Sequence, residues 1–359
     1  MDDERGTFQL KGRAALSNRP GRFERHDRLR VDDGWAHDPD ALPVLRTTTR
    51  VEVPRKIISY NTSPDLSFDR SINPYRGCEH GCVYCFARPS HAYLGLSPGL
   101  DFETQLIARP EAPEVLRREL AAKRYRPAPI AIGTNTDPYQ PIEKTHEITR
   151  ECLRVLADAG HPVAIVTKGS LIERDLDILS AMTRRGLVRV GISVTTLDAA
   201  LSRLMEPRVP PPARRLVTVR RLAEAGVPVR IMASPMIPTL TDPELEAILD
   251  AGRTAGARFA SWSMLRLPRE VSELMQEWLA QHFPDRADRI LARLREMHGG
   301  ALYDAAWHKR MRGEGAYAEM VAQRFAVTIK RVGLKAAAPP MRCDLFKPPV
   351  LPGAQMQLF

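Results

Sequence analysis

The stretch that decides the fold is residues 78–85, which read Cys78-Glu79-His80-Gly81-Cys82-Val83-Tyr84-Cys85. The spacing C-x3-C-x2-C brings three thiols close together, while Cys152 and Cys343 lie far away in the chain. Three thiolates around four irons leave one iron without a protein ligand, and that iron can bind a small molecule. Thiolates select soft or borderline metals, so Cys78, Cys82 and Cys85 indicate an iron–sulfur cluster first and zinc second.

Zinc is the alternative for this stretch. The three cysteines together with His80 or His91 would supply the Cys3His set of many structural zinc sites. Zinc-binding cysteines usually come in C-x2-C pairs, however, and the spacing here is different. We therefore expect a [4Fe-4S] cluster.

The same residues resemble a known family. The C-x3-C-x2-C spacing, with the aromatic Tyr84 directly before the third cysteine, resembles the signature of the radical S-adenosylmethionine (SAM) enzymes. The flanking residues Asn73–Cys78 and Cys85–Arg88 resemble the branch that contains spore photoproduct lyase, and the resemblance extends over roughly residues 55–265.

The resemblance implies a chemistry. The open iron of a [4Fe-4S] cluster would chelate SAM, and reductive cleavage of SAM would give a 5′-deoxyadenosyl radical that abstracts hydrogen from a substrate. This chemistry needs a low-potential electron, so the resemblance also implies an electron donor of the flavodoxin or ferredoxin type.

After the cysteines the sequence alternates short apolar strands with amphipathic helices. We expect strands at 128–133, 162–167, 188–195, 227–233 and 258–265, and helices at 111–125, 144–159, 171–184, 198–204, 213–225 and 243–255. Short apolar strands of this kind indicate a parallel sheet covered by helices. With the segment that delivers the cysteines as the first strand, the prediction is an α/β fold, a partial (β/α)6 TIM-like barrel with a C-terminal helical extension. A doubly wound open sheet is the alternative.

The chain divides into four expected segments. Residues 1–50 mix charges of both signs with few apolar residues, which predicts a mobile arm or a strap over the main domain. Residues 51–268 form the partial barrel, and residues 269–335 form a helical subdomain with helices at 269–281, 286–297 and 314–331. Residues 336–359 are punctuated by prolines and are expected to be extended.

Polar residues follow the expected strands, at the end where βα barrels place their sites. Thr134, Asn135 and Thr136 follow the strand at 128–133, and the resemblance assigns them to the loop that grips the amino group of SAM. The alternative is an Asn/Asp-Pro turn. Lys168 ends the strand at 162–167, where a lysine would be costly unless it meets an anion such as the SAM carboxylate or a carboxylate at the barrel rim.

Three further residues are candidates for binding SAM. Ser193 and Thr195 project to one face of a strand, so their hydroxyls suit the ribose or carboxylate of SAM, or else neighbouring backbone. By resemblance Tyr84 packs near the adenine, although a core aromatic is the alternative. The sequence assigns no catalytic residue.

The bulk properties limit the classes of protein. A net charge of +10 and a pI near 9.6 suggest nucleic acid as a partner, although the excess of arginine over lysine can also reflect a GC-rich genome. Five cysteines with three clustered do not make a disulfide framework and fit a reducing cytosol. No apolar run is long enough to span a membrane, so we expect a cytoplasmic protein.

Two features bear on the substrate. Spore photoproduct lyase returns hydrogen from a cysteine just after its second strand, whereas this chain has Gly133 and Thr134 there. Cys152 lies on an apolar helix face, and Cys343 lies in the tail, from which it would have to fold back. The resemblance therefore implies a different substrate on the same SAM-cleaving platform.

The last five residues, Gln355-Met356-Gln357-Leu358-Phe359, resemble the short motif by which bacterial DNA proteins dock on the replication sliding clamp. Two apolar anchors at a free end can insert into a pocket of a partner, or can pack on their own domain.

Three functions follow from these observations. The first is a radical SAM enzyme acting on nucleic acid, such as a damaged or modified base. The second is the same chemistry on a protein or small molecule. The third is a non-catalytic, metal-stabilised module that docks on a DNA-associated partner.

Overall fold

Six parallel strands neighbour one another in the order of the sequence, as the succession of strands and helices predicts. In a computed structural model that describes residues 11–24 and 45–351, they are β3 (Arg70–Ile72), β6 (Ile130–Ile132), β7 (Val163–Thr167), β8 (Val188–Ser193), β9 (Val229–Met236) and β10 (Phe259–Met264). The short strand β2 (Ile58–Tyr60) pairs antiparallel with β3 and completes a sheet of seven strands.

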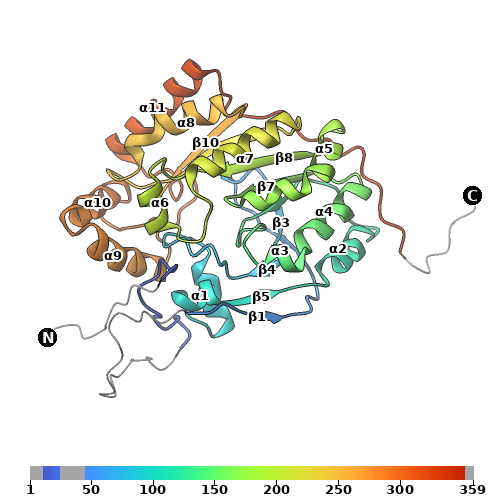
Figure 1. The fold of residues 1–359 in the computed structure, drawn as a ribbon, viewed down its shortest axis with the longest axis horizontal. Coiled ribbons are helices and arrows are strands. Elements are labelled where there is room, and N and C mark those ends of the chain that lie inside the picture. The colour runs from blue at the N-terminus through green and yellow to red at the C-terminus, as the bar shows by residue number, and fades with distance from the viewer. Residues whose placement is uncertain (1–10, 25–44, 352–359) are drawn as a thin grey trace, which may run out of the picture.

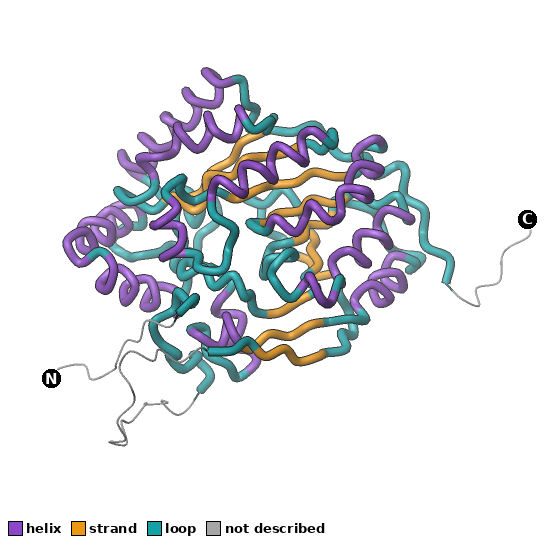
Figure 2. Tube along the Cα trace, viewed as in Figure 1, coloured by secondary structure: helices purple, strands orange, loops and turns teal. Residues whose placement is uncertain are grey.

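Helices cover one face of this sheet. They are α4 (Ile148–Asp158), α5 (Leu176–Arg184), α7 (Pro212–Glu224) and α8 (Leu245–Thr254), which lie across the strands in Figures 1 and 2. In β8 the residues Val188, Val190 and Ile192 are buried, whereas Arg189 between them is only half-buried. Since β10 and β2 are the two edges of the sheet, the barrel is open, as the prediction of a partial barrel requires.

A segment without regular structure, residues 304–312, joins the two edges of the open sheet. The amide of Met264 at the end of β10 donates to the carbonyl of Met311 at 2.8 Å. Arg310 donates from Nε and Nη2 to both carboxylate oxygens of Asp65, at 2.7 and 2.5 Å, and Asp65 lies in the loop between β2 and β3. We call residues 304–312 the lateral segment.

Two predicted helices begin differently from the prediction. The helix expected at 144–159 is divided into α3 (Glu143–His146) and α4 by Glu147, whose φ is +52°. The reason is the buried Glu143 carboxylate, which accepts hydrogen bonds from the amides of Thr149 and Arg150 in the first turn of α4. The helix expected at 171–184 starts as a 3-10 turn over Ser170–Asp175 before α5.

A second, three-stranded sheet was not predicted. It consists of β1 (Thr48–Val51), β5 (Gln105–Ala108) and β4 (Tyr75–Arg76), with the 3-10 segment Arg88–Leu94 and helix α1 (Leu100–Thr104) beside it. The alternation of Val51 and Val53 within residues 47–58 predicts a short strand or lead-in, and β1 lies there. All four residues of β1 are exposed, however, so the sequence does not indicate its pairing with β5.

The C-terminal helices occur where the sequence predicts them. They are α9 (Glu270–His282), α10 (Pro284–Met297) and α11 (Gly315–Val332). The short helices α2 (Ala112–Leu120) and α6 (Ala199–Met205) complete the set. Among the described residues, no helix is long and apolar enough to cross a membrane.

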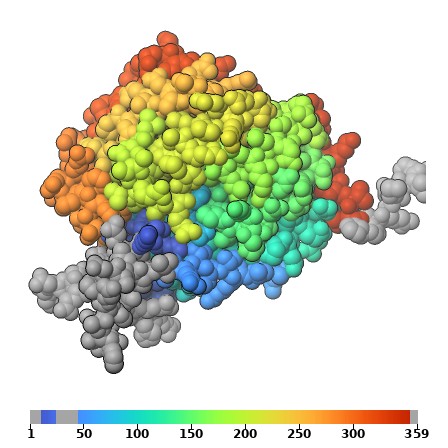
Figure 3. Space-filling view, in the orientation of Figure 1, coloured from blue at the N-terminus to red at the C-terminus, as the bar shows by residue number. Residues whose placement is uncertain are grey.

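The described parts of both terminal segments lie on the main body. Residues 11–24 contact α1 and α9, because Ser17 donates to Glu277 at 2.7 Å and Asn18 to Asp101 at 2.9 Å. Residues 336–351, red in Figure 3, lie against the green elements from the middle of the chain. Residues 355–359, which carry the clamp-like motif, lie outside the described residues.

Candidate active site

The three clustered cysteines lie on one loop between β4 and the 3-10 segment. Cys78 and Cys82 are buried and Cys85 is half-buried, and Cys85 packs against both clusters of buried residues that contain the other two. All five cysteines of the chain are free thiols. The loop therefore holds three unoxidised thiols side by side.

The donor set fits a [4Fe-4S] cluster. Burial raises the pKa of the Cys78 and Cys82 thiols, so each needs a nearby cation to become a thiolate. In residues 11–24 and 45–351, no three His, Cys, Asp or Glu side chains are arranged to hold a single metal ion. A mononuclear zinc site requires such an arrangement, whereas a cubane takes one thiolate on each of three irons.

The two histidines considered as zinc ligands are engaged by protein groups. His80 Nδ1 lies 3.3 Å from the carboxylate of Asp137, and His91 Nε2 lies 3.0 Å from the carbonyl oxygen of Gln105. Nδ1 of His91 is buried and has no hydrogen-bond partner, so one ring nitrogen of His91 is not engaged, but among the described residues His91 is not part of any arrangement of three metal-binding side chains.

A buried arginine holds the cysteine loop in shape. Arg88, which is fully buried, donates to the carbonyls of Gly81, Cys82, Pro98 and Gly99 at 2.9–3.1 Å. Its charge is balanced by Glu103 at 2.5 Å, which also accepts from the amide of Ala15 in the N-terminal segment. Arg88 belongs to the flanking motif of the sequence, which by itself indicates no role for it.

A glycine lets the loop pass close to this ion pair. Gly81 has a φ of +66°, and a Cβ there would lie 2.7 Å from the Glu103 carboxylate. A side chain would therefore be strained and would displace the partner of Arg88.

The loop after β6 clamps the cysteine loop from the other side. Thr136 donates from Oγ1 to the Gly77 carbonyl at 2.6 Å. Gln140 accepts from the amide of Glu79 at 2.8 Å and donates to Thr136 at 2.9 Å. The hydroxyl of Thr136, a predicted SAM contact, is therefore engaged in holding the cysteine loop.

The carboxylate of Asp137 joins the loops after β6 and β7. It accepts from Thr167 Oγ1 at 2.6 Å and from the Lys168 amide at 2.8 Å, and it faces His80. Burial disfavours the ionised carboxyl, but His80 and these hydrogen bonds outweigh burial and hold the pKa of Asp137 at about 2. Asp137 was not predicted as a site residue, although it lies in the predicted SAM loop.

Three predicted residues are linked by buried hydrogen bonds through Glu206 and the Ser234 carbonyl. Tyr84 hydrogen-bonds through Oη to Glu206 and to Thr195 Oγ1, the latter at 3.0 Å. Ser193 and Thr195 both donate to the carbonyl of Ser234, which confirms that they share a face. Glu206 is paired with the buried Arg215, yet burial raises its pKa.

The remaining predicted residues keep more open side chains. Thr134 and Asn135 are half-buried and are positioned by Asn73, whose Oδ1 accepts from the Asn135 amide at 3.0 Å. Lys168 places Nζ 5.4 Å from the centre of the Tyr84 ring and partly offsets the effect of burial on the pKa of Cys82. Within the described chain, Lys168 makes no ion pair, so its ammonium group is available to an anion beside the cysteines.

The other two thiols do not join this site. Cys152 is fully buried in α4, as predicted. Cys343 lies in a tail segment whose amides at Arg342 and Lys347 donate to the carbonyls of Gly186 and Ala159, just before β8 and β7. This is the amino end of the sheet, whereas the cysteine loop meets the carboxyl end, so Cys343 does not fold back to the site.

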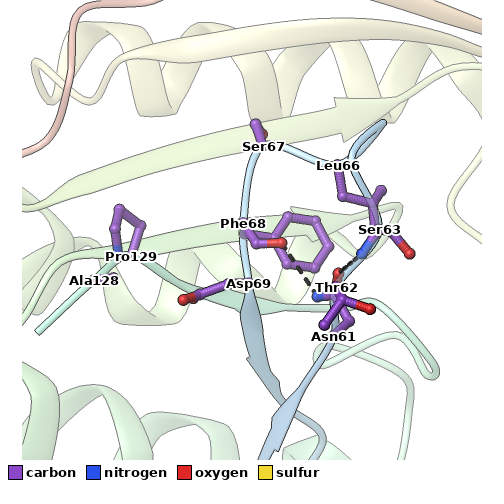
Figure 4. Close-up of a pocket in the computed structure, with 9 residues that line it drawn as sticks. All are labelled: Asn61, Thr62, Ser63, Leu66, Ser67, Phe68, Asp69, Ala128 and Pro129. Carbon is purple, nitrogen blue, oxygen red and sulfur yellow. Dashed lines mark hydrogen bonds between the residues drawn. The ribbon is translucent and has the colours of Figure 1, made fainter. Parts of the chain in front are cut away.

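A hollow of about 430 Å³ lies at the amino ends of β3 and β6, between residues 61–69 and Pro129 (Figure 4). Its Asn61 side chain donates to the Phe68 carbonyl at 3.1 Å and accepts from the Ser63 amide, and Asp69 is paired with Arg70. These are contacts of a local turn, at the end of the strands opposite to the cysteine loop. We assign no chemistry to this hollow.

Comparison with known proteins identifies the family. Residues 72–252 match the family model described as the radical SAM superfamily. An uncharacterised protein of Mycobacterium tuberculosis is 34% identical over 294 residues, which are 78% of this chain and 83% of that protein. An uncharacterised protein of Methanocaldococcus jannaschii is 25% identical over 214 residues, which are 60% of this chain and 76% of that protein.

The fold has a counterpart among solved structures. Spore photoproduct lyase complexed with dinucleoside spore photoproduct superposes with a TM-score of 0.57 at 15% identity, over 80% of this chain and 81% of the lyase chain. At this identity the likeness concerns the fold alone. The chain belongs to the radical SAM superfamily, which implies a [4Fe-4S] cluster and SAM, and it is a radical SAM enzyme with a fold like that of spore photoproduct lyase.

Proposed function

We propose that this enzyme binds a [4Fe-4S] cluster through Cys78, Cys82 and Cys85 and acts on a nucleic-acid substrate, such as a damaged or modified base. When bound, the cluster and SAM supply the 5′-deoxyadenosyl radical that abstracts hydrogen. The observation that carries the proposal is the set of three adjacent thiols on a loop fixed by Arg88, beside an ammonium group with no carboxylate partner in the described chain.

The residues around the loop have distinct proposed roles. Lys168 neutralises the carboxylate of SAM, because its Nζ lies near Cys82 and Tyr84 and pairs with no described acid. Thr134 and Asn135 offer oxygen atoms to the SAM amino group. The Thr136 hydroxyl is occupied by the Gly77 carbonyl, so Thr136 acts mainly by fixing the cysteine loop.

The wall formed by Tyr84, Ser193 and Thr195 has a positioning role in this proposal. Their hydroxyl groups bond to one another, to the Glu206 carboxylate or to the Ser234 carbonyl. A hydroxyl oxygen that donates one hydrogen bond can still accept another, as Ser193 can here. We therefore propose that this wall faces the ribose and adenine of SAM through ring and hydroxyl contacts.

Two observations support a nucleic acid as substrate. The net charge is +10, and the lyase with the similar fold binds a dinucleoside photoproduct. No described cysteine other than the three on the loop lies at the carboxyl end of the sheet. The proposed reaction is therefore one in which no such thiol returns hydrogen to the substrate. The electron that starts the reaction would come from a partner of the flavodoxin or ferredoxin type.

The test is anaerobic reconstitution with iron and sulfide, followed by dithionite and SAM. The proposal expects 5′-deoxyadenosine from the intact chain and from Cys343→Ala, and none from Cys82→Ala. A labelled oligonucleotide carrying deuterium at its sugars and bases then tests the substrate, because deuterium must appear in the 5′-deoxyadenosine. Formation of 5′-deoxyadenosine without deuterium from any oligonucleotide would contradict the nucleic-acid part.

A further inference from the structure

Beside the cysteine loop lies a hollow of about 230 Å³ that none of the predicted roles explains. Its walls come from four distant parts of the chain: the N-terminal segment, residues 86–93 after Cys85, the loop after β6, and the loop after β10. Asn135, from the loop expected to grip SAM, and Ser90 lie in its lining, and their side chains are 3.4 Å apart. The hollow is therefore next to the proposed SAM site.

Aromatic rings are unusually exposed around this hollow. The exposed fractions are 45% for Phe86, 68% for Tyr93 and 58% for Phe23, and the centres of the Phe23 and Tyr93 rings are 5.2 Å apart. Exposed aromatic residues that gather at one place mark a binding surface more often than a solvent face. Phe86 directly follows the half-buried thiol of Cys85.

Arginines stack on the same rings. The guanidinium of Arg266 lies 4.6 Å from the centre of the Phe86 ring, and that of Arg22 lies 4.6 Å from Phe23 and 4.7 Å from Tyr93. Arg269 also lines the hollow, at a φ of +54°, a strained conformation of the kind that collects at ligand sites.

The charge of this surface is not balanced. Arg22 pairs with Glu270 at 3.0 Å. Among the described residues Arg266 and Arg269 have no carboxylate partner, and the buried Nε of Arg266 has no hydrogen-bond partner at all. Arg266 donates to the Tyr303 hydroxyl at 3.4 Å, and Arg269 lies at the Tyr93 hydroxyl, so both have neutral partners only. The surface therefore presents ring faces together with two guanidinium groups whose charge no described carboxylate balances.

We propose that Phe23, Phe86, Tyr93, Arg22, Arg266 and Arg269, the aromatic–arginine patch, bind unpaired nucleotides of a single-stranded nucleic acid next to the cluster. Bases stack on aromatic faces whatever their identity, and guanidinium groups pair with the phosphates between them. An acidic peptide could satisfy the arginines but would leave the three ring faces without flat partners. This inference rests on the proposed function for its substrate class.

The test measures binding of fluorescein-labelled dT12 to the full-length, cluster-loaded protein by anisotropy at several salt concentrations. Tyr93→Leu should weaken binding by between about 5-fold and 150-fold, the range for loss of one base stack. Arg266→Gln should make the plot of log association constant against log salt concentration less steep by about 0.7, the contribution of one phosphate contact of a single strand. The matched control is Tyr60→Leu. Tyr60 is 63% exposed and has the guanidinium of Arg70 5.3 Å from its ring centre, as Tyr93 has that of Arg22, but it lies on β2, outside the patch. The Tyr60→Leu variant should bind dT12 like the wild type.

Two further arms decide the kind of nucleic acid. A 12-base-pair duplex should bind more weakly than dT12, and rU12 compared with dT12 distinguishes RNA from DNA. Equal loss of binding in Tyr60→Leu and Tyr93→Leu, or tighter binding of the duplex, would overturn the proposal.

The outcomes also separate the two proposals. A protein that makes 5′-deoxyadenosine but does not bind dT12 at low salt disproves the patch and leaves the radical chemistry standing. A protein that binds dT12 through Tyr93 and Arg266 but cleaves no SAM supports the patch and contradicts the proposed function.

Discussion

At the scale of single residues, the ion pair of Arg88 and Glu103 fixes the cysteine loop. Both side chains are fully buried, and Arg88 donates to two carbonyls of the cysteine loop, Gly81 and Cys82, and to two carbonyls just before α1, Pro98 and Gly99. Removal of one partner of a buried pair leaves the other charge without compensation, which is more costly than loss of the pair as a whole.

Arg88→Leu should therefore lower the free energy of unfolding by about 3–5 kcal/mol and reduce the iron content after reconstitution. Urea unfolding of the protein measures the first effect, and iron analysis the second. Arg154→Leu, at an exposed arginine on α4, is the control. A loss as small as that of the control would show that Arg88 does not hold the loop.

The substitution Lys168→Met tests whether the carboxylate of SAM binds at the Lys168 ammonium group. A hydrogen bond between two charged groups contributes about 1.5–3 kcal/mol, so Lys168→Met should raise the Kd for SAM by roughly 10-fold to 150-fold. Calorimetric titration of the cluster-loaded protein with SAM measures this, with Lys144→Met at an exposed lysine as the control. An unchanged Kd would place the SAM carboxylate elsewhere.

The sequence predicts the site only in part. The spacing of the three cysteines is enough to indicate an iron–sulfur site. Lys168 is recognisable because it is a charged residue at the end of an apolar strand. The partners that position them, Glu103, Asp137 and Glu206, are acids like any others in the sequence. Their roles come from contacts between residues 15 to 122 positions apart, such as Arg88 with Glu103 and Tyr84 with Glu206, which a linear pattern does not show.

At the scale of elements, strands and helices of the barrel follow the sequence closely because each buries an apolar stripe. The exceptions have tertiary causes. The break between α3 and α4 at Glu147 depends on the Glu143 carboxylate, and the three-stranded sheet depends on pairing of β1 with β5, about 57 residues away. Neither the break nor this pairing leaves a periodic signal in the sequence.

Phe346 of the C-terminal tail packs against the buried side chain of His161. The Phe346 ring meets the His161 ring edge to face, with ring centres 5.4 Å apart, and lies tilted against Tyr125 with ring centres 5.5 Å apart. The Tyr125 hydroxyl lies 2.7 Å from His161 Nε2. Burial lowers the pKa of His161 to about 4, with the Pro162 carbonyl opposing and the charge of Arg70 adding to this effect.

This shift predicts acid destabilisation. Between about pH 6.5 and pH 4 the unfolded chain binds a proton at His161 that the folded chain does not, so the free energy of unfolding should fall by about 3 kcal/mol as the pH is lowered through this window. Urea unfolding at pH 7, 5.5 and 4.5 measures the fall, and His161→Gln should reduce it. His308→Gln, at an exposed histidine, should not change the pH profile; equal profiles for all three proteins would contradict the assignment.

At the scale of the whole molecule, the lateral segment (residues 304–312) joins the edges of an open sheet. Arg310 and Asp65 are mostly buried, with 15% and 8% of their side chains exposed, and together they connect β10 to the β2–β3 loop. Among the described residues, this ion pair connects the lateral segment with the β2 edge of the sheet.

Asp65→Ala should loosen the lateral segment without unfolding the barrel. Amide hydrogen exchange of residues 304–312 should become about 10-fold faster, which corresponds to a loss of roughly 1.4 kcal/mol of local stability, while exchange in α4 stays the same. Mass spectrometry of exchanged peptides measures both regions. Faster exchange in both, or in neither, would show that the ion pair does not act locally.

The central claim is that the three loop cysteines hold a [4Fe-4S] cluster whose open iron binds SAM. The most direct measurement is iron and sulfide analysis of the anaerobically reconstituted protein, with electron paramagnetic resonance of its reduced form before and after addition of SAM. We predict about four irons and four sulfides per chain, a reduced-cluster signal that changes when SAM is added, and loss of both in the Cys78→Ser/Cys82→Ser/Cys85→Ser variant. Zinc in place of iron, or a full cluster in that triple variant, would contradict the account.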